Sequence, residues 1–261
     1  MTFVAVLATE IIKLRRTKML PLSWLAFSAM PIAVGLFTWI VKEPDRAAGL
    51  GLLGQKAQLA TLRADWSSYF ALLLQATGIG GMILASVIAS YVFGREHAEG
   101  TAKNLLTLPV ERRWFVLAKL VVVLLWFAAL MLALVTEGIA VCVALGLPGY
   151  TANALSSGVV DIFVAAAVVS LLVPVVAWVA LVGEGYLAPL GFTIFMLVLG
   201  NVLGATGWGK WFPWSIVPLF AGVAGPRSDT LAASSAWVLA LTFVAGLWAS
   251  MRRLSFADNT Q

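Results

Sequence analysis

The sequence offers few residues that could do acid–base or metal chemistry, and they do not occur in sets. Its only histidine, His97, has no second histidine and no cysteine near it, and its only cysteine, Cys142, lies inside an apolar run. Metal sites and hydrolytic sites need several such groups that converge on one point. We therefore expect no catalytic residue, no metal site and no cofactor, and we interpret Cys142 as a packing residue.

Two glycine-containing patterns bear on nucleotide binding. Residues 49–54 match G-x-G-x-x-G, but they follow an apolar run instead of a strand, so we interpret the match as chance. The only Gly-Lys pair, Gly209-Lys210, is followed by Trp211 instead of Ser or Thr, so the sequence has no phosphate-binding P-loop. If nucleotide hydrolysis drives this protein, we expect another chain to carry it out.

The composition is that of a membrane protein, because 61% of the residues are hydrophobic and only 11% are charged. Each apolar stretch is near or above the ~20 residues that a helix needs to cross a bilayer, and none shows the alternation of a barrel strand. We predict an all-α integral membrane protein with a single permease domain, residues 1–261, and six transmembrane helices. The predicted spans are 22–41, 67–93, 115–145, 158–182, 186–203 and 231–251.

The basic residues lie mainly at the ends of these spans, which is a membrane pattern and not a nucleic-acid-binding one. With the N-terminus inside, eleven basic residues near the span ends lie in cytoplasmic segments and six lie outside. We therefore expect both termini in the cytoplasm, a multi-pass protein of a cell membrane (a bacterial inner membrane), the lipid bilayer as a partner and no nucleic acid.

Two further segments are expected to lie at the membrane surfaces. Residues 2–18 fit an amphipathic helix on the inner surface, although a cytoplasmic extension of the first span is the alternative. Its apolar stripe is Val4, Leu7, Ile11 and Leu14, with Glu10, Lys13 and Arg16 elsewhere. Residues 204–220 are too short and too interrupted by glycine and proline to cross, so we expect a re-entrant or interfacial segment on the outer side.

The most informative region is the coupling segment, residues 94–114, between the second and third spans. We expect a short amphipathic element here that projects at the inner surface. The alternative is an ordinary charged loop that only anchors two helices. The expected element has Gly94 and Gly100 as breaks, Thr101 as a cap, Leu105 and Leu106 on its apolar side and Pro109 at its end.

These residues resemble the loop between spans two and three in permease subunits of type 2 ABC transporters, the ABC-2 family. The matching positions that we assign to ATPase coupling are Glu96, Glu99, Gly100, Thr101, Leu105, Leu106, Pro109 and Arg112. In that family the loop forms a coupling helix that docks on the ATP-hydrolysing subunit. The resemblance also implies an N-terminal elbow helix and an outer re-entrant segment. One departure is Ala98, where the family has a second acidic residue.

Glu137 lies inside the third span, where an acid is costly and is by default a functional candidate. Its helical stripe consists of small residues suited to close packing. These are Ala129, Ala133, Ala140 and Ala144. Glu137 could line a transport pathway or exchange a proton, or it could bond to a neighbouring helix.

The resemblance implies the transmembrane permease subunit of an ATP-driven ABC exporter. Two copies, or one copy and a paralogue, would form the pathway and bind cytoplasmic ATPase subunits, which bind the ATP. The alternatives are an ion-coupled secondary transporter that uses Glu137, or a membrane anchor or intramembrane enzyme without transport activity. The sequence does not indicate the substrate.

Overall fold

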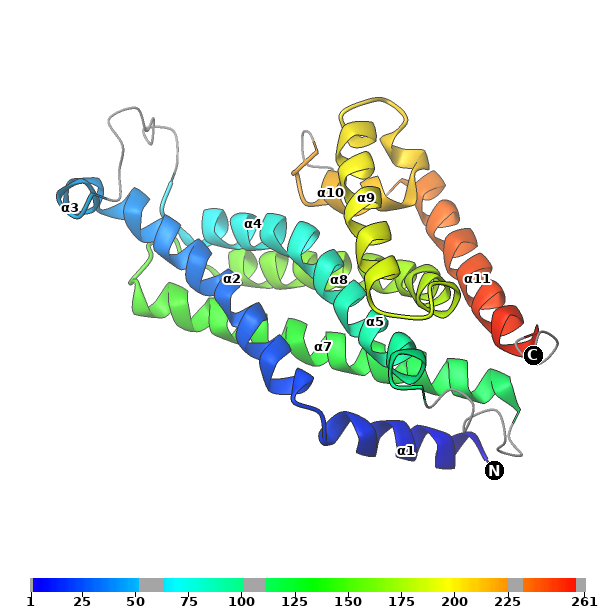
Figure 1. Cartoon of the computed structure of the whole chain (residues 1–261). Helices are drawn as coiled ribbons and strands as arrows, with labels where there is room; N and C mark the ends of the chain where they lie inside the picture. The colour runs from blue at the N-terminus through cyan, green and yellow to red at the C-terminus, as the bar shows by residue number, and fades with distance from the viewer. Residues whose placement is uncertain (1, 52–62, 101–110, 225–231, 257–261) are drawn as a thin grey trace.

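The computed structural model describes residues 2–51, 63–100, 111–224 and 232–256, and the regular structure in these ranges is helical. Figure 1 labels the principal helices. In chain order the elements are α1 (Phe3–Arg15), α2 (Met19–Lys42), α3 (Pro44–Gly49), α4 (Trp66–Ala76), the π-helical turn η1 (Thr77–Gly81), α5 (Met82–Ala98), α7 (Arg112–Ala144), α8 (Ala152–Val182), α9 (Leu187–Gly204), the 3-10 turn η2 (Gly209–Trp211), α10 (Pro213–Phe220) and α11 (Ala233–Phe256).

Six helical stretches are long and apolar enough to cross a membrane, which confirms the predicted all-α fold with six spans. They are α2, the continuous stretch α4–η1–α5, α7, α8, α9 and α11. Several helices extend beyond the predicted spans; α7 begins at Arg112 instead of 115, and α8 at Ala152 instead of 158. Hydropathy falls where polar and charged residues begin, but the backbone hydrogen bonding of a helix does not stop there.

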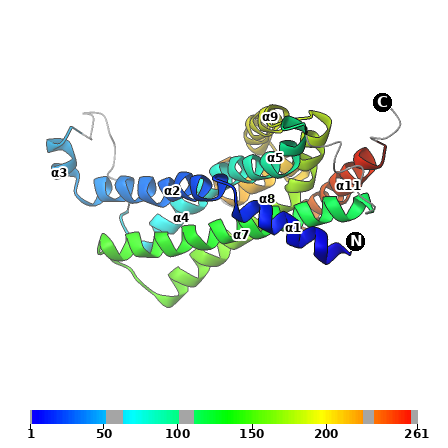
Figure 2. The same ribbon diagram turned by 60° about the horizontal axis from the view of Figure 1, so that its bottom comes forward.

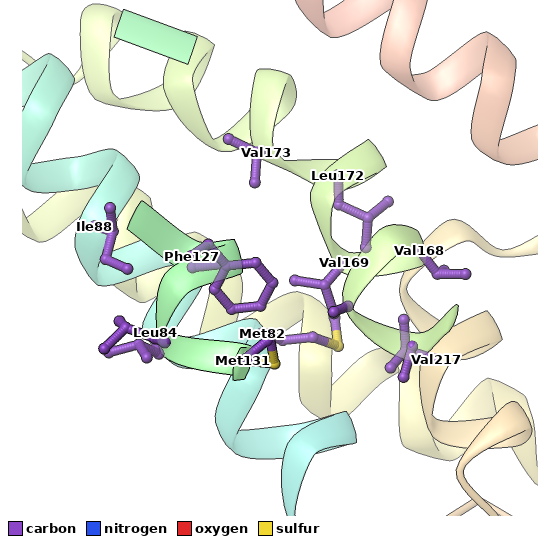
Figure 3. Close-up of a cluster of buried hydrophobic side chains, with 14 of the residues drawn as sticks. Met82, Leu84, Ile88, Phe127, Met131, Val168, Val169, Leu172, Val173 and Val217 are labelled. Carbon is purple, nitrogen blue, oxygen red and sulfur yellow. The ribbon is translucent and has the colours of Figure 1, made fainter. Parts of the chain in front are cut away.

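Helix α8 lies at the centre of the molecule and packs against α4, α5, α7, α9, α10 and α11. Figure 3 shows the apolar core that α8 shares with α5, α7 and α10. Met82 of α5, Met131 of α7, Val169 of α8 and Val217 of α10 are each nearly or fully buried there. In the peripheral helices α2, α9 and α11 only 22% of the most apolar stretch is buried, as expected of helices that face lipid.

The start of α1 and the end of α11 lie at the same end of the molecule, and α3 lies at the opposite end (Figures 1 and 2). Both termini lie on the same side of a membrane when the chain crosses it an even number of times. Which end faces the cytoplasm remains the prediction made from the basic residues.

The contact between α8 and α11 depends on a glycine. A Cβ atom at Gly246 would lie 2.6 Å from the backbone nitrogen of Val175, so a larger residue could not approach α8 so closely. Ser250, one turn further along α11, donates a hydrogen bond to the Pro174 carbonyl at 3.1 Å. Pro174 lies inside a continuous α8, so α11 packs against the part of α8 where proline removes a backbone donor.

The segment after α9 turns back and packs α10 against α9. Gly200 and Gly204 of α9 allow this close contact: added Cβ atoms would lie 2.6 Å from the Trp214 carbonyl oxygen and 2.6 Å from the Ala224 side chain, respectively. The segment 204–220 contains the 3-10 turn η2 and the eight-residue helix α10, which is too short to cross a membrane. Its location on the outer side remains a prediction.

Candidate functional site

Four charged side chains form a buried ionic cluster where α1, α5 and α7 meet. The cluster consists of Glu10 and Lys13 of α1, Glu96 of α5 and Lys119 of α7. Glu10, Glu96 and Lys119 are only 3%, 7% and 4% exposed. Because burying an unpaired charge is very costly, such an arrangement requires each charge to have a partner, and two carboxylates are balanced here by two ammonium groups.

Lys119 holds the cluster together. Its Nζ lies 3.0 Å from Glu96 Oε1, 3.4 Å from Glu10 Oε2 and 2.9 Å from the carbonyl oxygen of Val92. An ammonium group has three hydrogens, so these three acceptors use all of its donors. Lys119 thus ties the start of α7 to both α1 and the last turns of α5.

Lys13 closes the cluster on its more exposed side. Its Nζ lies 2.7 Å from Glu10 Oε1 and 3.1 Å from Glu96 Oε1. Burial acts to lower the pKa of Lys13, but the two carboxylates outweigh this effect and raise the pKa above its ordinary value. Arg95 adds a longer contact, 3.9 Å from Glu10 Oε2. Lys13 is therefore held in its charged form.

The amphipathic character of α1 places Glu10 in the protein interior. Val6, Glu10 and Lys13 recur at helical spacing and face α5 and α7, whereas Val4 and Ile12 are exposed. Val6 packs with Phe115 of α7 in a small apolar cluster beside the ions. The charged stripe of α1 thus contacts protein, and part of its apolar stripe faces outward.

The coupling segment begins differently from the prediction. Gly94 does not break the chain: α5 continues to Ala98, and Gly94 allows close contact with the loop after α8, since an added Cβ would lie 2.7 Å from the Gly185 carbonyl oxygen. The helix ends at Glu99 and Gly100, both exposed, and Gly100 has a φ of +68°, which favours glycine.

The remaining residues assigned to coupling fall into two groups. Thr101, Leu105, Leu106 and Pro109 lie outside the described residues. Arg112 is the first residue of α7, and its Nη1 donates a hydrogen bond to the Leu254 carbonyl of α11 at 2.9 Å. Glu96 and Arg112 therefore contact other helices of this chain, while Glu99 and Gly100 are accessible to another protein.

Glu137 of α7 bonds to the first span. Its Oε1 lies 3.1 Å from Trp24 Nε1 and 2.8 Å from Ser28 Oγ, both on α2. This is the neighbouring-helix bond that the sequence left open beside a pathway role. The carboxyl is only partly buried, and the small residues Ala140 and Ala144 on its stripe are exposed.

From the sequence we placed Glu10 and Lys13 on the N-terminal amphipathic helix and Lys119 just after the coupling segment, but we did not predict that these residues form a cluster. One signal was available, because Lys119 is a lysine inside the apolar stretch 115–145, where a cation needs a partner. Within the described ranges no group of three or more His, Cys, Asp or Glu side chains could hold a metal ion. The cluster can therefore position helices, and we assign it no chemical step.

Comparison with known proteins agrees with this architecture. Residues 6–200, three quarters of the chain, match the family described as ABC-2 family transporter protein. A relative, the bacitracin transport permease protein BCRB of Bacillus licheniformis, is 32% identical over 160 residues, which cover 60% of this chain and 73% of the relative. Residues 6–200 contain the whole ionic cluster, four of the six spans and most of the fifth, α9. The chain thus belongs to the ABC-2 family of transporter proteins.

Proposed function

We propose that this chain is the membrane subunit of an ATP-driven exporter and that it receives the work of ATP hydrolysis at residues 94–114. Two copies, or one copy and a paralogue, form the pathway between them, and separate ATPase subunits dock from the cytoplasm. The proposal rests on family membership and on one observation: a buried ionic cluster lies beside the two helix ends that border this segment.

The ionic cluster can transmit force from the end of α5 to other helices. A partner that pushes on Glu99 or Gly100 pushes on the end of α5, one turn beyond Glu96. Glu96 is bonded to Lys119 of α7 and to Lys13 of α1, so the three helices respond as a unit. Arg112 extends the same connection to α11 through the Leu254 carbonyl.

A charged contact suits this purpose better than an apolar one. Buried ion pairs add little net stability compared with apolar packing, but they specify which groups must meet. The attraction between ammonium and carboxylate groups at about 3 Å weakens steeply when the groups separate and no water enters between them. A small displacement of α5 therefore moves α1 and α7 as well.

The description of the relative supports a first substrate to test. The relative is described as a bacitracin transport permease, so we propose a peptide antibiotic as the first substrate to test for this chain. Because the identity is 32% over 60% of the chain, bacitracin itself is one candidate among related peptides.

Co-purification with a co-expressed ABC ATPase of the same genome, the one encoded nearest to this gene, tests the proposal. We expect a complex whose ATPase activity the membrane subunit changes. Glu99→Lys should weaken the complex at least tenfold, and Asp45→Lys, which reverses another exposed charge on α3 at the opposite end, should not. If no complex forms with the wild-type chain, or if both variants behave alike, the proposal is wrong.

One observation supports a second candidate, ion-coupled transport. Glu137 is an acid inside a span with hydrogen-bond partners on another span, as a proton-coupling group requires. Transport in proteoliposomes that contain a proton gradient but no ATPase would favour this candidate. Transport that needs ATP and the ATPase, with or without the gradient, would favour the exporter.

A further inference from the structure

The turn between α1 and α2 carries three basic side chains that the ionic cluster does not use. Arg15, Arg16 and Lys18 lie within four residues, and all three are exposed. No hydrogen bond or ion pair connects their side chains to the rest of the described chain. We refer to these three residues as the cationic turn.

The fold fixes the direction of the cationic turn. Thr17, between Arg16 and Lys18, shares a hydrogen bond of 2.6 Å with the Tyr91 hydroxyl of α5. Its Oγ1 also accepts a hydrogen bond from the Met19 backbone nitrogen at 3.2 Å. Thr17 thus faces the protein, whereas the basic side chains on either side of it, Arg16 and Lys18, are exposed.

The acidic residue of α1 is buried, whereas the basic residues at its end are exposed. Its single acidic residue, Glu10, faces inward and is neutralised by Lys13 and Lys119, so it does not offset the basic residues of the turn. The exposed charged residues of α1 and the turn are therefore all basic. A cluster of exposed basic residues attracts anionic ligands.

The surroundings of the turn are apolar. Ile12, one turn before it, is 52% exposed, and Leu22 and Leu25, in the first two turns of the span α2, are 57% and 71% exposed. A ligand that satisfies both features carries a phosphate next to hydrocarbon chains. These are the features of a membrane phospholipid at the level where α2 enters the bilayer.

We propose that the cationic turn is a binding site for an anionic phospholipid, with the phosphate on Arg15, Arg16 and Lys18 and the acyl chains along Leu22 and Leu25. The phosphate accepts charge-assisted hydrogen bonds from the guanidinium and ammonium groups. The lipid would hold the junction between α1 and the first span at a fixed depth in the membrane. This site is independent of the ATPase and of the transported substrate.

Binding of labelled lipids to the purified full-length chain tests the proposal. Phosphatidylglycerol and phosphatidylcholine, each with a dansyl group on one acyl chain, are titrated in dodecyl maltoside at low salt, and energy transfer from tryptophan reports binding. Each basic side chain near the surface contributes about fivefold in affinity for anionic lipid. Arg15→Gln Arg16→Gln should therefore weaken phosphatidylglycerol binding about twenty-fivefold, with little effect on phosphatidylcholine.

Three controls define the outcome. Arg46→Gln Lys210→Gln, which removes two exposed basic residues elsewhere, should keep the wild-type affinity. The variant Arg15→Lys Arg16→Lys keeps both charges and should retain most of the wild-type affinity for phosphatidylglycerol. Inorganic phosphate, compared with chloride at equal ionic strength, should not displace the lipid, because it lacks acyl chains.

Protection of the buried Cys142 from a thiol-reactive dye establishes that each variant is folded. Equal binding of the two lipids by the wild-type chain would overturn the proposal. So would a folded Arg15→Gln Arg16→Gln variant with wild-type phosphatidylglycerol affinity. Displacement by inorganic phosphate would show an anion site without lipid specificity and would also overturn it.

Discussion

Removal of Lys119 is the sharpest perturbation of the ionic cluster. Lys119→Met keeps roughly the length of the side chain and an apolar stem but removes the ammonium group. The two carboxylates, Glu10 and Glu96, stay buried with one positive charge fewer beside them. Removing one partner of a buried ion pair costs about 3–5 kcal/mol. Because Lys13 still contacts both carboxylates, we expect the lower end of this range, about 3 kcal/mol.

The single cysteine provides the assay. Cys142 is fully buried, so a thiol-reactive fluorescent dye reports unfolding as the temperature rises. A loss of about 3 kcal/mol should lower the Tm by roughly 6–12 °C for a chain of this size. The control Lys210→Met removes an exposed lysine and should stay within about 0.5 kcal/mol of the wild type.

A rescue experiment separates charge from packing. Lys119→Met combined with Glu10→Gln and Glu96→Gln removes the uncompensated carboxylates while the side chains keep their shapes. The Tm of this triple variant should return most of the way to that of the wild type, since Lys13 is partly exposed and can be hydrated. A Tm for Lys119→Met within 2 °C of the wild type, or a triple variant no more stable than the single one, would refute our reasoning.

Three further predictions concern other parts of the molecule. Gly246→Ala should destabilise the chain by about 1–3 kcal/mol, because the added methyl group clashes with Val175, whereas Gly191→Ala, which has open space, should not; dye-monitored unfolding distinguishes the two. Because its pKa in the folded state is raised, Lys13 contributes its full stabilisation below pH 10.5, and this stabilisation is lost as the pH rises through the folded-state pKa. The Tm difference between the wild type and Lys13→Met should therefore narrow only above pH 10.5. Glu137→Gln keeps an acceptor oxygen and should unfold like the wild type, whereas Glu137→Leu should lose about 1 kcal/mol, and an equal Tm for both would contradict the hydrogen bonds from α2.

The number and location of the spans follow from the sequence because hydrocarbon imposes a minimum length and excludes charge. The helix ends were less predictable for a physical reason. Arg95 and Glu96 look like the start of a loop, yet α5 continues through them because Glu96 finds partners on α1 and α7. The same pairing explains why Lys119 lies inside an otherwise apolar helix.

The sequence did not predict which residues meet between helices. The stripe that carries Glu10 and Lys13 is visible by periodicity, but periodicity does not say whether it faces water or protein. Likewise, the cost of an acid in a span marks Glu137 as unusual, whereas its partners on α2 depend on how two helices cross. Gly94 shows the same limit, since it was expected to break the chain and instead allows close contact with Gly185.

The central claim is that the coupling segment faces the compartment that holds the ATPase. Cysteine accessibility tests it most directly, in a Cys142→Ala background with either Glu99→Cys at the exposed end of α5 or Asp45→Cys on α3 at the opposite end. A membrane-impermeant maleimide added to intact cells should label position 45 and should label position 99 only after the cells are opened. Labelling of position 99 from outside intact cells would place the segment beyond the reach of any cytoplasmic ATPase and would contradict the account.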